Sequence, residues 1–316
     1  MYRIGIDLGG TNIAVGLVND DHKIVVKKTT PTLATREADA IVADMARLCL
    51  EACAEKGVDI KDIANIGIAS PGIANPVNGC VEYANNLPFY RFPIVQILSD
   101  ALGVDRSKIK IANDANAAAW GEAVAGAAKG SANSIMVTLG TGVGGGIIIN
   151  NKILVGFNSA AGEIGHIVIE QDGAQCGCGR RGCWEAYSSA TALIRMTKEA
   201  LAECEKTGRY TSMSKAERIS GRTACDAMRA GDEVATEVYN KYVKYLATGI
   251  TNLVNIFQPE VISLGGGVSN EGQSLIDAIL PLVRAEQYGG DVVALTQLRI
   301  ATLGNDAGII GAAALE

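Results

Sequence analysis

The chain opens with a strand–turn–strand pattern that occurs a second time near its middle. Residues 4–19 and residues 135–150 align without a gap: each reads as an apolar strand, a turn rich in glycine and threonine, a second apolar strand and an Asn turn. A third apolar segment follows in each copy, at residues 23–26 and 152–155. Such a repeat indicates a duplicated β-hairpin unit. It predicts two α/β domains that each open on this hairpin.

Apolar periodicity and turn residues suggest the remaining elements. In the first half we expect a helix at residues 37–56, a strand at 63–69, a loop at 75–88 rich in Asn, Pro and Gly, a helix at 93–102 and a strand at 109–112. In the second half we expect helices between 188 and 257, a strand at 261–264, a helix at 275–286, a strand at 298–301 and a terminal helix from residue 306. The alternation predicts largely parallel central sheets.

The domain boundary is placed by the repeat, because no linker or low-complexity tract divides the chain. We expect residues 1–114 to form a small α/β domain, joined by the terminal segment 302–316. Residues 115–301 would then form a large α/β domain that contains a zinc-binding segment.

Four side chains of metal-ligand type lie within eighteen residues: His166, Cys176, Cys178 and Cys183. The spacing H-x9-C-x-C-x4-C, with glycines between the cysteines, allows three sulfurs and an imidazole to meet at one point. Zinc is the expected ion, and its role is structural because four protein ligands leave no open coordination position. The alternative is a disulfide with a spare thiol, or buried cysteines that act as small apolar side chains.

A turn with phosphate-binding chemistry follows the first strand. It begins after Asp7 and contains Gly9, Gly10, Thr11 and Asn12. Successive backbone N–H groups and the threonine hydroxyl can hold phosphate oxygens. Asp7 at the strand end is placed to hold a magnesium-bound nucleotide.

Two further glycine runs resemble the first. Gly140, Thr141 and Gly142 occupy the equivalent turn of the second hairpin, and Gly265, Gly266 and Gly267 follow the strand at residues 261–264. We interpret them as a second phosphate-binding turn and as a surface for the base or ribose. Any one of them alone is also typical of ordinary strand ends and tight turns.

The second turn matches the dinucleotide fingerprint only in its letters. Residues 140–145 read G-x-G-x-x-G, but an apolar strand follows at residues 147–149 where that fingerprint requires a helix. A Walker A loop is also absent, because no Gly-Lys-Ser/Thr occurs in the chain.

Asp114 lies where a strand runs into an alanine-rich helix, in the segment 113–122. It could cap that helix. The functional hypothesis is a general base that takes a proton from a substrate hydroxyl as the oxygen attacks phosphorus.

Taken together, these motifs resemble the ROK family of sugar kinases over the whole chain, within the actin/hexokinase-like superfamily. The matching segments are residues 7–11, 113–116, 140–146, 162–166, 176–185 and 265–267. The run Cys-x-Cys-Gly-x-x-Gly-Cys-x-Glu is the most specific of them. The resemblance implies two actin/hexokinase-like (ribonuclease H-like) domains with the active site in the cleft between them.

The resemblance also implies roles for individual residues. Asp114 would be the catalytic base, and the cofactors would be ATP, Mg²⁺ and a structural Zn²⁺. The sugar would be bound by Gly72, Asn86, Asn113, Asp114, Glu163, His166 and Glu185. We expect loss of the metal to weaken sugar binding while nucleotide binding at the distant glycine turns is kept.

The expected activity is ATP-dependent phosphorylation of a hexose at the 6-hydroxyl, with glucose as the first choice and a place in glycolysis. Other kinases of the same family act on N-acetylglucosamine, N-acetylmannosamine, allose or fructose, and these stay open. A sugar-sensing regulator is a further alternative, although the chain starts directly at the first phosphate strand. The family also leads us to expect a homodimer or a higher homo-oligomer.

Composition excludes other classes of function. A net charge of −6 gives no basic surface for nucleic acid or an anionic membrane. The N-terminal segment is not a signal peptide, because Asp7 interrupts any apolar run. The remaining cysteines are scattered, which favours reduced thiols and a cytoplasmic protein.

Overall fold

The computed structural model describes residues 1–316, and the contacts divide the chain into two compact units. The first unit contains Met1–Met136, Gly146–Gly162 and Thr302–Glu316, and the second contains Val137–Gly145 and Glu163–Ala301. The second hairpin contributes residues to both units. The predicted domain boundary near Asp114 stays a prediction, because compactness alone does not show which segments fold independently.

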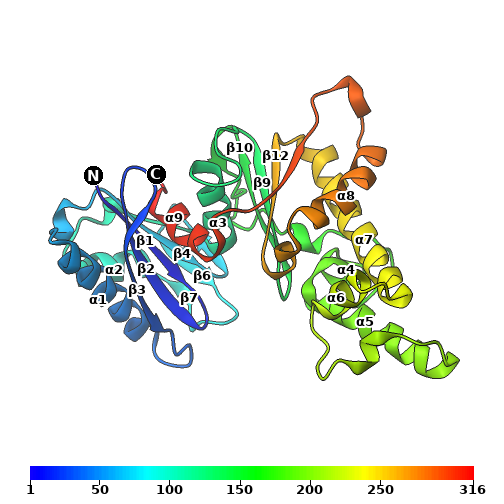
Figure 1. The fold of residues 1–316 in the computed structure, drawn as a ribbon. Helices are drawn as coiled ribbons and strands as arrows, with labels where there is room; N and C mark the ends of the chain where they lie inside the picture. The colour runs from blue at the N-terminus through cyan, green and yellow to red at the C-terminus, as the bar shows by residue number, and fades with distance from the viewer. The chain divides into compact units, whose positions relative to one another are not determined.

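A five-stranded mixed sheet forms the centre of the first unit (Figure 1). Its strands, in spatial order, are β3 (Ile24–Pro31), β2 (Asn12–Val18), β1 (Arg3–Leu8), β4 (Ile66–Ser70) and β8 (Ile109–Asn113). Strands β1, β4 and β8 are parallel, as predicted, whereas β2 pairs antiparallel with both β1 and β3, because tight turns connect these three strands in chain order. The carboxyl ends of β1, β4 and β8 therefore meet at one edge.

The second sheet repeats this order strand for strand. It runs β11 (Lys152–Ile153), β10 (Val143–Ile149), β9 (Ser134–Leu139), β12 (Val261–Gly265) and β13 (Gln297–Ile300). A hairpin again lies beside strands that arrive by long connections, and β12 and β13 are parallel. The predicted α/β class with a duplicated hairpin is confirmed.

The segment predicted as a loop at residues 75–88 is in part a small antiparallel sheet, so that prediction was wrong. Its strands are β5 (Ile73–Asn75), β6 (Cys80–Tyr83) and β7 (Tyr90–Phe92). Each has only three or four residues. Strands this short are at or below the length of about four residues from which alternation can be recognised in a sequence.

Helices cover both faces of the first sheet (Figure 1). They are α1 (Ala38–Lys56), α2 (Ile94–Leu102), α3 (Asp114–Val124) and α9 (Ala307–Ala313). Helix α1 packs on β2 and β3, and α9 packs on β1 and β4. Gly5 and Gly67 make the second contact possible, because a Cβ at either position would overlap a carbonyl of α9.

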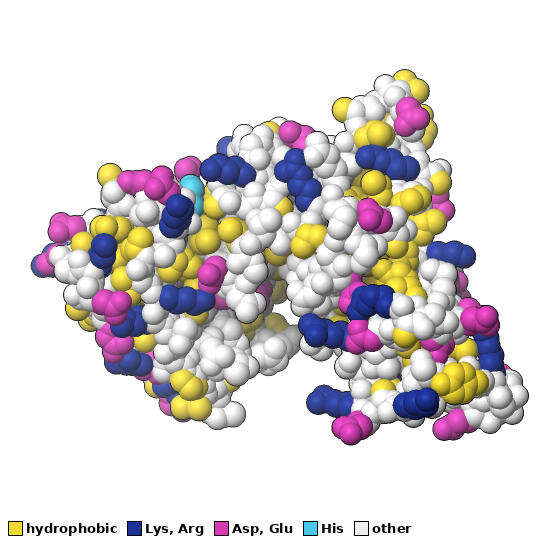
Figure 2. Space-filling view, viewed as in Figure 1, with side chains coloured by type: hydrophobic (Ala, Val, Ile, Leu, Met, Phe, Trp, Pro, Cys, Tyr) yellow, Lys and Arg dark blue, Asp and Glu magenta, His cyan; other side chains and the backbone are white.

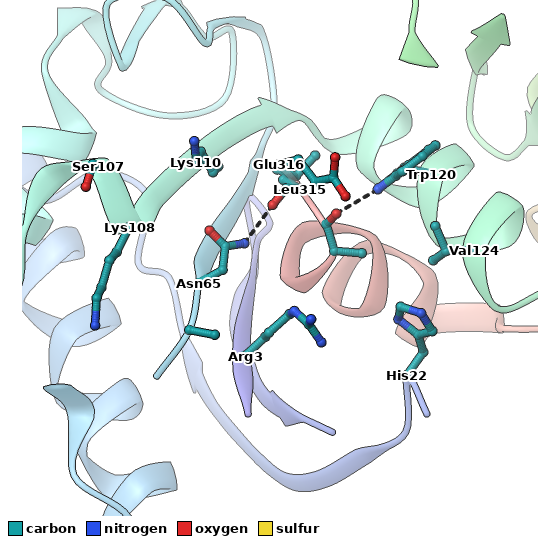
Figure 3. Close-up of a pocket in the computed structure, with 12 residues that line it drawn as sticks. Arg3, His22, Asn65, Ser107, Lys108, Lys110, Trp120, Val124, Leu315 and Glu316 are labelled. Atoms are coloured by element: carbon teal, nitrogen blue, oxygen red, sulfur yellow. Dashed lines mark hydrogen bonds between the residues drawn. The ribbon is translucent and has the colours of Figure 1, made fainter. Parts of the chain in front are cut away.

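The residues after α9 are held in the first unit by side-chain hydrogen bonds (Figure 3). Trp120 Nε1 donates to the Ala314 carbonyl at 3.0 Å, and Asn65 Nδ2 donates to the Leu315 carbonyl at 2.8 Å. A pocket of about 720 Å³ lies beside them, near the amino ends of β1, β4 and β8. It is therefore at the opposite edge of the sheet from the residues predicted to be functional.

The helices of the second unit gather around one long helix. They are α4 (Glu185–Ser188), α5 (Ala190–Thr207), α6 (Thr223–Arg229), α7 (Glu233–Phe257) and α8 (Gln273–Glu286). Helix α7 packs against the other four.

No helix of the structure is long and apolar enough to span a membrane. Acidic and basic side chains are interspersed on the face drawn in Figure 2, which shows no extended area of one sign.

Candidate active site

Asp114 is the first residue of α3, directly after β8. The residue that caps the helix is Asn113, whose Oδ1 accepts hydrogen bonds from the N–H groups of Ala115 at 2.9 Å and Asn116 at 3.2 Å. Asp114 Oδ1 accepts a further bond from Ala115 at 2.9 Å. The capping function is therefore filled by Asn113 and not by Asp114.

Two predicted sugar-binding turns lie near this strand end. Asn113 Nδ2 donates to the Gly72 carbonyl at 3.0 Å, which joins the turn after β4 to the end of β8. Gly72 has φ 86°, and a Cβ there would overlap the Tyr83 carbonyl, so only glycine fits. Asn86 is exposed, and its Cβ lies 3.5 Å from where Gly10 would carry a Cβ.

The carboxylates of Asp7 and Asp114 influence each other. The pKa of Asp7 is raised from 3.8 to about 6, mainly by burial and also by the negative charge of Asp114, while Lys27 acts in the opposite direction. Loss of surrounding water also raises the pKa of Asp114, against the hydrogen bond from Ala115. Two carboxyl groups with raised pKa values at one sheet edge are typical of a functional site.

The first glycine turn, residues 9–12, is closed by bonds that leave two amides free. Gly9 N–H donates to the Asn12 carbonyl at 2.9 Å, and the Thr32 hydroxyl donates to the Gly9 carbonyl at 2.6 Å. The Thr32 N–H donates to the Thr11 carbonyl at 2.8 Å. The N–H groups of Gly10 and Thr11 have no partner in the chain and can bind an anion.

The second glycine turn, residues 140–143, has the same property. Gly140 N–H donates to the Gly142 carbonyl at 3.0 Å. The Ala190 N–H donates to the Gly140 carbonyl at 2.8 Å, and the Thr191 hydroxyl donates to the Thr141 carbonyl at 2.7 Å. The N–H groups of Thr141 and Gly142 stay without a partner, so this turn can also bind an anion.

The third glycine run lies beside the second turn. Gly266 has φ 84°, and a Cβ there would lie 2.6 Å from the Leu139 carbonyl oxygen, directly before the turn.

Strand β10 begins at Val143, so no helix opens at the second turn. The dinucleotide fingerprint therefore fails here, as predicted.

The Cys3His cluster, made of His166, Cys176, Cys178 and Cys183, converges in the second unit. The four ligand atoms lie within 4.8 Å of one another. Cys178 Sγ is 3.7 Å from Cys183 Sγ, and Cys176 Sγ is 3.7 Å from His166 Nδ1. Around a tetrahedral zinc ion two sulfurs lie about 3.8 Å apart, whereas a disulfide bond is about 2.0 Å long. All eight cysteines are free thiols. The donors and their spacing fit zinc, and the disulfide alternative does not match this geometry.

Residues other than the four ligands support the cluster. Arg180 donates from Nη1 to the His166 carbonyl at 3.0 Å. Trp184 is fully buried, donates from Nε1 to the Tyr245 carbonyl at 3.1 Å, and packs where Gly249 has no side chain. The sequence shows Trp184 next to Cys183, but its partners on α7 are about sixty residues away and no local pattern indicates them.

The two predicted sugar-binding glutamates differ in their contacts. Glu163 is exposed and directly precedes the short 3-10 turn Ile164–His166. Glu185 Oε2 accepts a hydrogen bond from the Val143 N–H at 3.0 Å, and Oε1 lies 3.5 Å from Cys176 Sγ. The second glycine turn is therefore adjacent to the cluster, and our expectation that the turns are distant from the metal is wrong for this one.

A model of the ROK family matches residues 3–316. The chain belongs to the ROK family. Glucokinase of Streptomyces coelicolor is 37% identical over 318 residues, which cover 99% of this chain and 96% of that protein. N-acetylmannosamine kinase of Citrobacter koseri is 30% identical over 318 residues, covering 100% of this chain and 98% of its own.

A solved structure matches along the same length. The ROK family glucokinase from Streptomyces griseus, in complex with glucose and AMPPNP, superposes with a TM-score of 0.77 at 34% identity, covering 99% of this chain and 98% of that one. The predicted family is confirmed, and the chain is a glucokinase-like member of it. The matches include kinases for different sugars, so the family alone does not fix the substrate.

Proposed function

We propose that the protein transfers the γ-phosphoryl group of ATP to the 6-hydroxyl of a hexose, and that its preferred hexose is glucose. The observation that carries the proposal is Asp114, whose carboxylate has a raised pKa at the end of β8 and interacts with the charge of Asp7, beside the first glycine turn. The Streptomyces griseus relative in complex with glucose and AMPPNP supports it.

In the proposed reaction Asp114 acts as the general base. It accepts the proton of the 6-hydroxyl as that oxygen attacks the γ-phosphorus, and the bond from this phosphorus to the bridging oxygen breaks to release ADP. Asn113 holds the base in place, because its side chain caps α3 and binds the Gly72 carbonyl.

The nucleotide phosphates would bind the free amides of the two glycine turns. Gly10 and Thr11 provide them in the first turn, and Thr141 and Gly142 in the second. Asp7 would hold the Mg²⁺ that neutralises the phosphates, and a bound cation would overcome the raised pKa of this carboxylate. Residues 265–267, beside the second turn, would face the ribose or base.

The sugar hydroxyls would bind polar side chains next to the Cys3His cluster. His166 directs Nδ1 at Cys176, which leaves Nε2 for a sugar hydroxyl. Glu163 and Glu185 flank the cluster in sequence and provide acceptors. Zinc held by the cluster would fix the fold of this loop. The proton transfer and the phosphoryl transfer do not involve it.

The second candidate substrate is an N-acetylhexosamine, because the N-acetylmannosamine kinase of Citrobacter koseri is 30% identical along the whole chain. An acetamido group in place of the 2-hydroxyl needs more room and a different hydrogen-bond partner. A site built around a hydroxyl can disfavour an analogue that lacks it by as much as ~10⁴–10⁵-fold.

A coupled ADP-release assay over glucose, N-acetylglucosamine, N-acetylmannosamine, allose and fructose tests the proposal. We expect glucose to give the highest kcat/KM, with the sugar-free reaction as the control for background ATP hydrolysis. A preference for an N-acetylated sugar would transfer the assignment to the second candidate. ADP release that no sugar stimulates would contradict the kinase assignment.

A further inference from the structure

We infer that Glu185 couples the Cys3His cluster to the second glycine turn, so that metal binding and nucleotide binding strengthen each other. Glu185 would thus be a positioning residue for the nucleotide as well as a ligand for the sugar. The inference rests on the proposed zinc and ATP sites, but adds a link between them that neither site requires.

The carboxylate of Glu185 contacts both partners. Oε1 lies 3.5 Å from Cys176 Sγ, in the cluster, and Oε2 accepts the Val143 N–H at 3.0 Å, in the second turn. A carboxylate that accepts a backbone N–H makes a charge-assisted bond, which is about twice as strong as one between neutral groups. Glu185 also lies two residues after the ligand Cys183, so its position depends on the cluster, and the position of the turn depends on Glu185.

The segment that holds the cluster packs tightly against the second glycine turn at two positions. A Cβ at Gly142 would overlap Oε2 of Glu185, and a Cβ at Gly165, beside the ligand His166, would overlap the Val143 carbonyl oxygen. Val143 is thus contacted at its N–H and at its carbonyl by the two ends of the loop that holds the cluster. Gly140, in the same turn, would carry a Cβ without any atom within 4 Å, so the crowding is specific to these positions.

The consequence follows from linkage. The free N–H groups of Thr141 and Gly142 directly precede Val143, and they can bind phosphate together only while the turn keeps its shape. An ion that fixes Cys183 and His166 fixes the neighbouring residues Glu185 and Gly165, which contact Val143, and hence the turn. Any increase in nucleotide affinity that the metal causes must be matched by an equal increase in metal affinity that the nucleotide causes.

The test measures zinc affinity by competition with a chelating dye, with and without AMPPNP and Mg²⁺. We expect the zinc affinity of the wild-type protein to rise at least ~5-fold with the nucleotide, within the usual range of coupling between sites. The AMPPNP affinity measured by calorimetry should fall by the same factor when the zinc is removed.

Substitutions in the turn locate the coupling. Gly142→Ala should displace Glu185 and weaken zinc binding, whereas Gly140→Ala, the matched control, should leave zinc affinity unchanged. If Gly142→Ala fails to fold, Glu185→Gln provides a second test. It keeps the size of the side chain but loses its charge, so we expect AMPPNP to have a smaller effect on zinc affinity in this variant than in the wild type.

The outcomes separate this inference from the proposed function. Zinc affinity that is identical with and without AMPPNP, in a protein that binds both, would overturn the coupling and leave the kinase assignment standing. Purified protein without about one zinc per chain would overturn the coupling and the proposed zinc site, and protein without affinity for AMPPNP would overturn the coupling and the kinase assignment.

Discussion

The two glycine turns occupy equivalent places in the duplicated hairpin, yet different side chains surround them. In the gap-free alignment Asp7 of the first copy corresponds to Thr138 of the second. The first turn is closed by Thr32, which directly follows β3 of its own hairpin unit. The second is held by Glu185 and Thr191, which come from helices outside the repeat.

The comparison shows which properties persisted through duplication. Free N–H groups are a property of the turn conformation, so both copies keep them although their side chains differ. Charged side chains are not fixed by that conformation. The first copy has the carboxylate of Asp7 beside Asp114, whereas the second copy is hydrogen-bonded to Glu185, next to the Cys3His cluster. In the proposed function the first copy belongs to the proton and magnesium chemistry, and the second to positioning.

Substitution of the proposed base is the largest expected effect. Asp114→Asn should fold and bind sugar, because the change is isosteric, but turnover should fall by roughly 10²–10⁴-fold or more. Steady-state kinetics and sugar-binding calorimetry would show this split. Asp62→Asn, an exposed carboxylate of the same unit, is the matched control and should leave turnover unchanged. Near-normal turnover in Asp114→Asn would contradict the assignment of the proton transfer to Asp114, beside the first glycine turn.

The raised pKa of Asp7, in the first copy only, predicts that the free energy of unfolding depends on pH. Because the folded-state pKa of about 6 lies above the ordinary value of 3.8, the native state binds more protons than the unfolded state between these values. The free energy of unfolding therefore falls as pH rises through that window and stays lower above pH 6.

Asp7→Asn should remove this loss of stability. Without nucleotide and Mg²⁺, the variant should be more stable than the wild type at pH 8 by up to about 3 kcal/mol, and the gain should shrink toward pH 4. Urea denaturation at several pH values measures it, and kinase turnover should fall in the same variant. A gain that is equal at pH 4 and pH 8 would show that ionisation of Asp7 is not its cause.

The smallest expected effect compares the two threonine hydroxyls that bind turn carbonyls. Thr32 is fully buried, whereas Thr191 is exposed. Thr32→Val should cost about 1–3 kcal/mol, because the Gly9 carbonyl loses its partner away from water, and Thr191→Val should cost less than about 1 kcal/mol, because water can replace the hydroxyl. Denaturant unfolding of both variants checks the order. Equal losses would mean that the two turns are held alike.

Long periodic segments were predictable because their pattern is local. The helix expected at residues 37–56 is α1 (Ala38–Lys56), and the strand expected at 261–264 is β12 (Val261–Gly265). The short strands β5, β6 and β7 were not, since their pairing depends on partners across a turn. The identity of the capping residue also needed the structure, because Asn113 and Asp114 are both good caps by type.

The sequence alone determined the duplicated hairpin, the glycine turns, the four metal-ligand side chains and the family, since these depend on residue type at fixed spacing. Only the tertiary structure decided which groups those residues meet. It brings Glu185 to Val143 over 42 positions of the chain, and it leaves the Thr141 and Gly142 amides unpaired. Such contacts arise from packing between segments far apart in sequence, where spacing along the chain carries no information about distance in space.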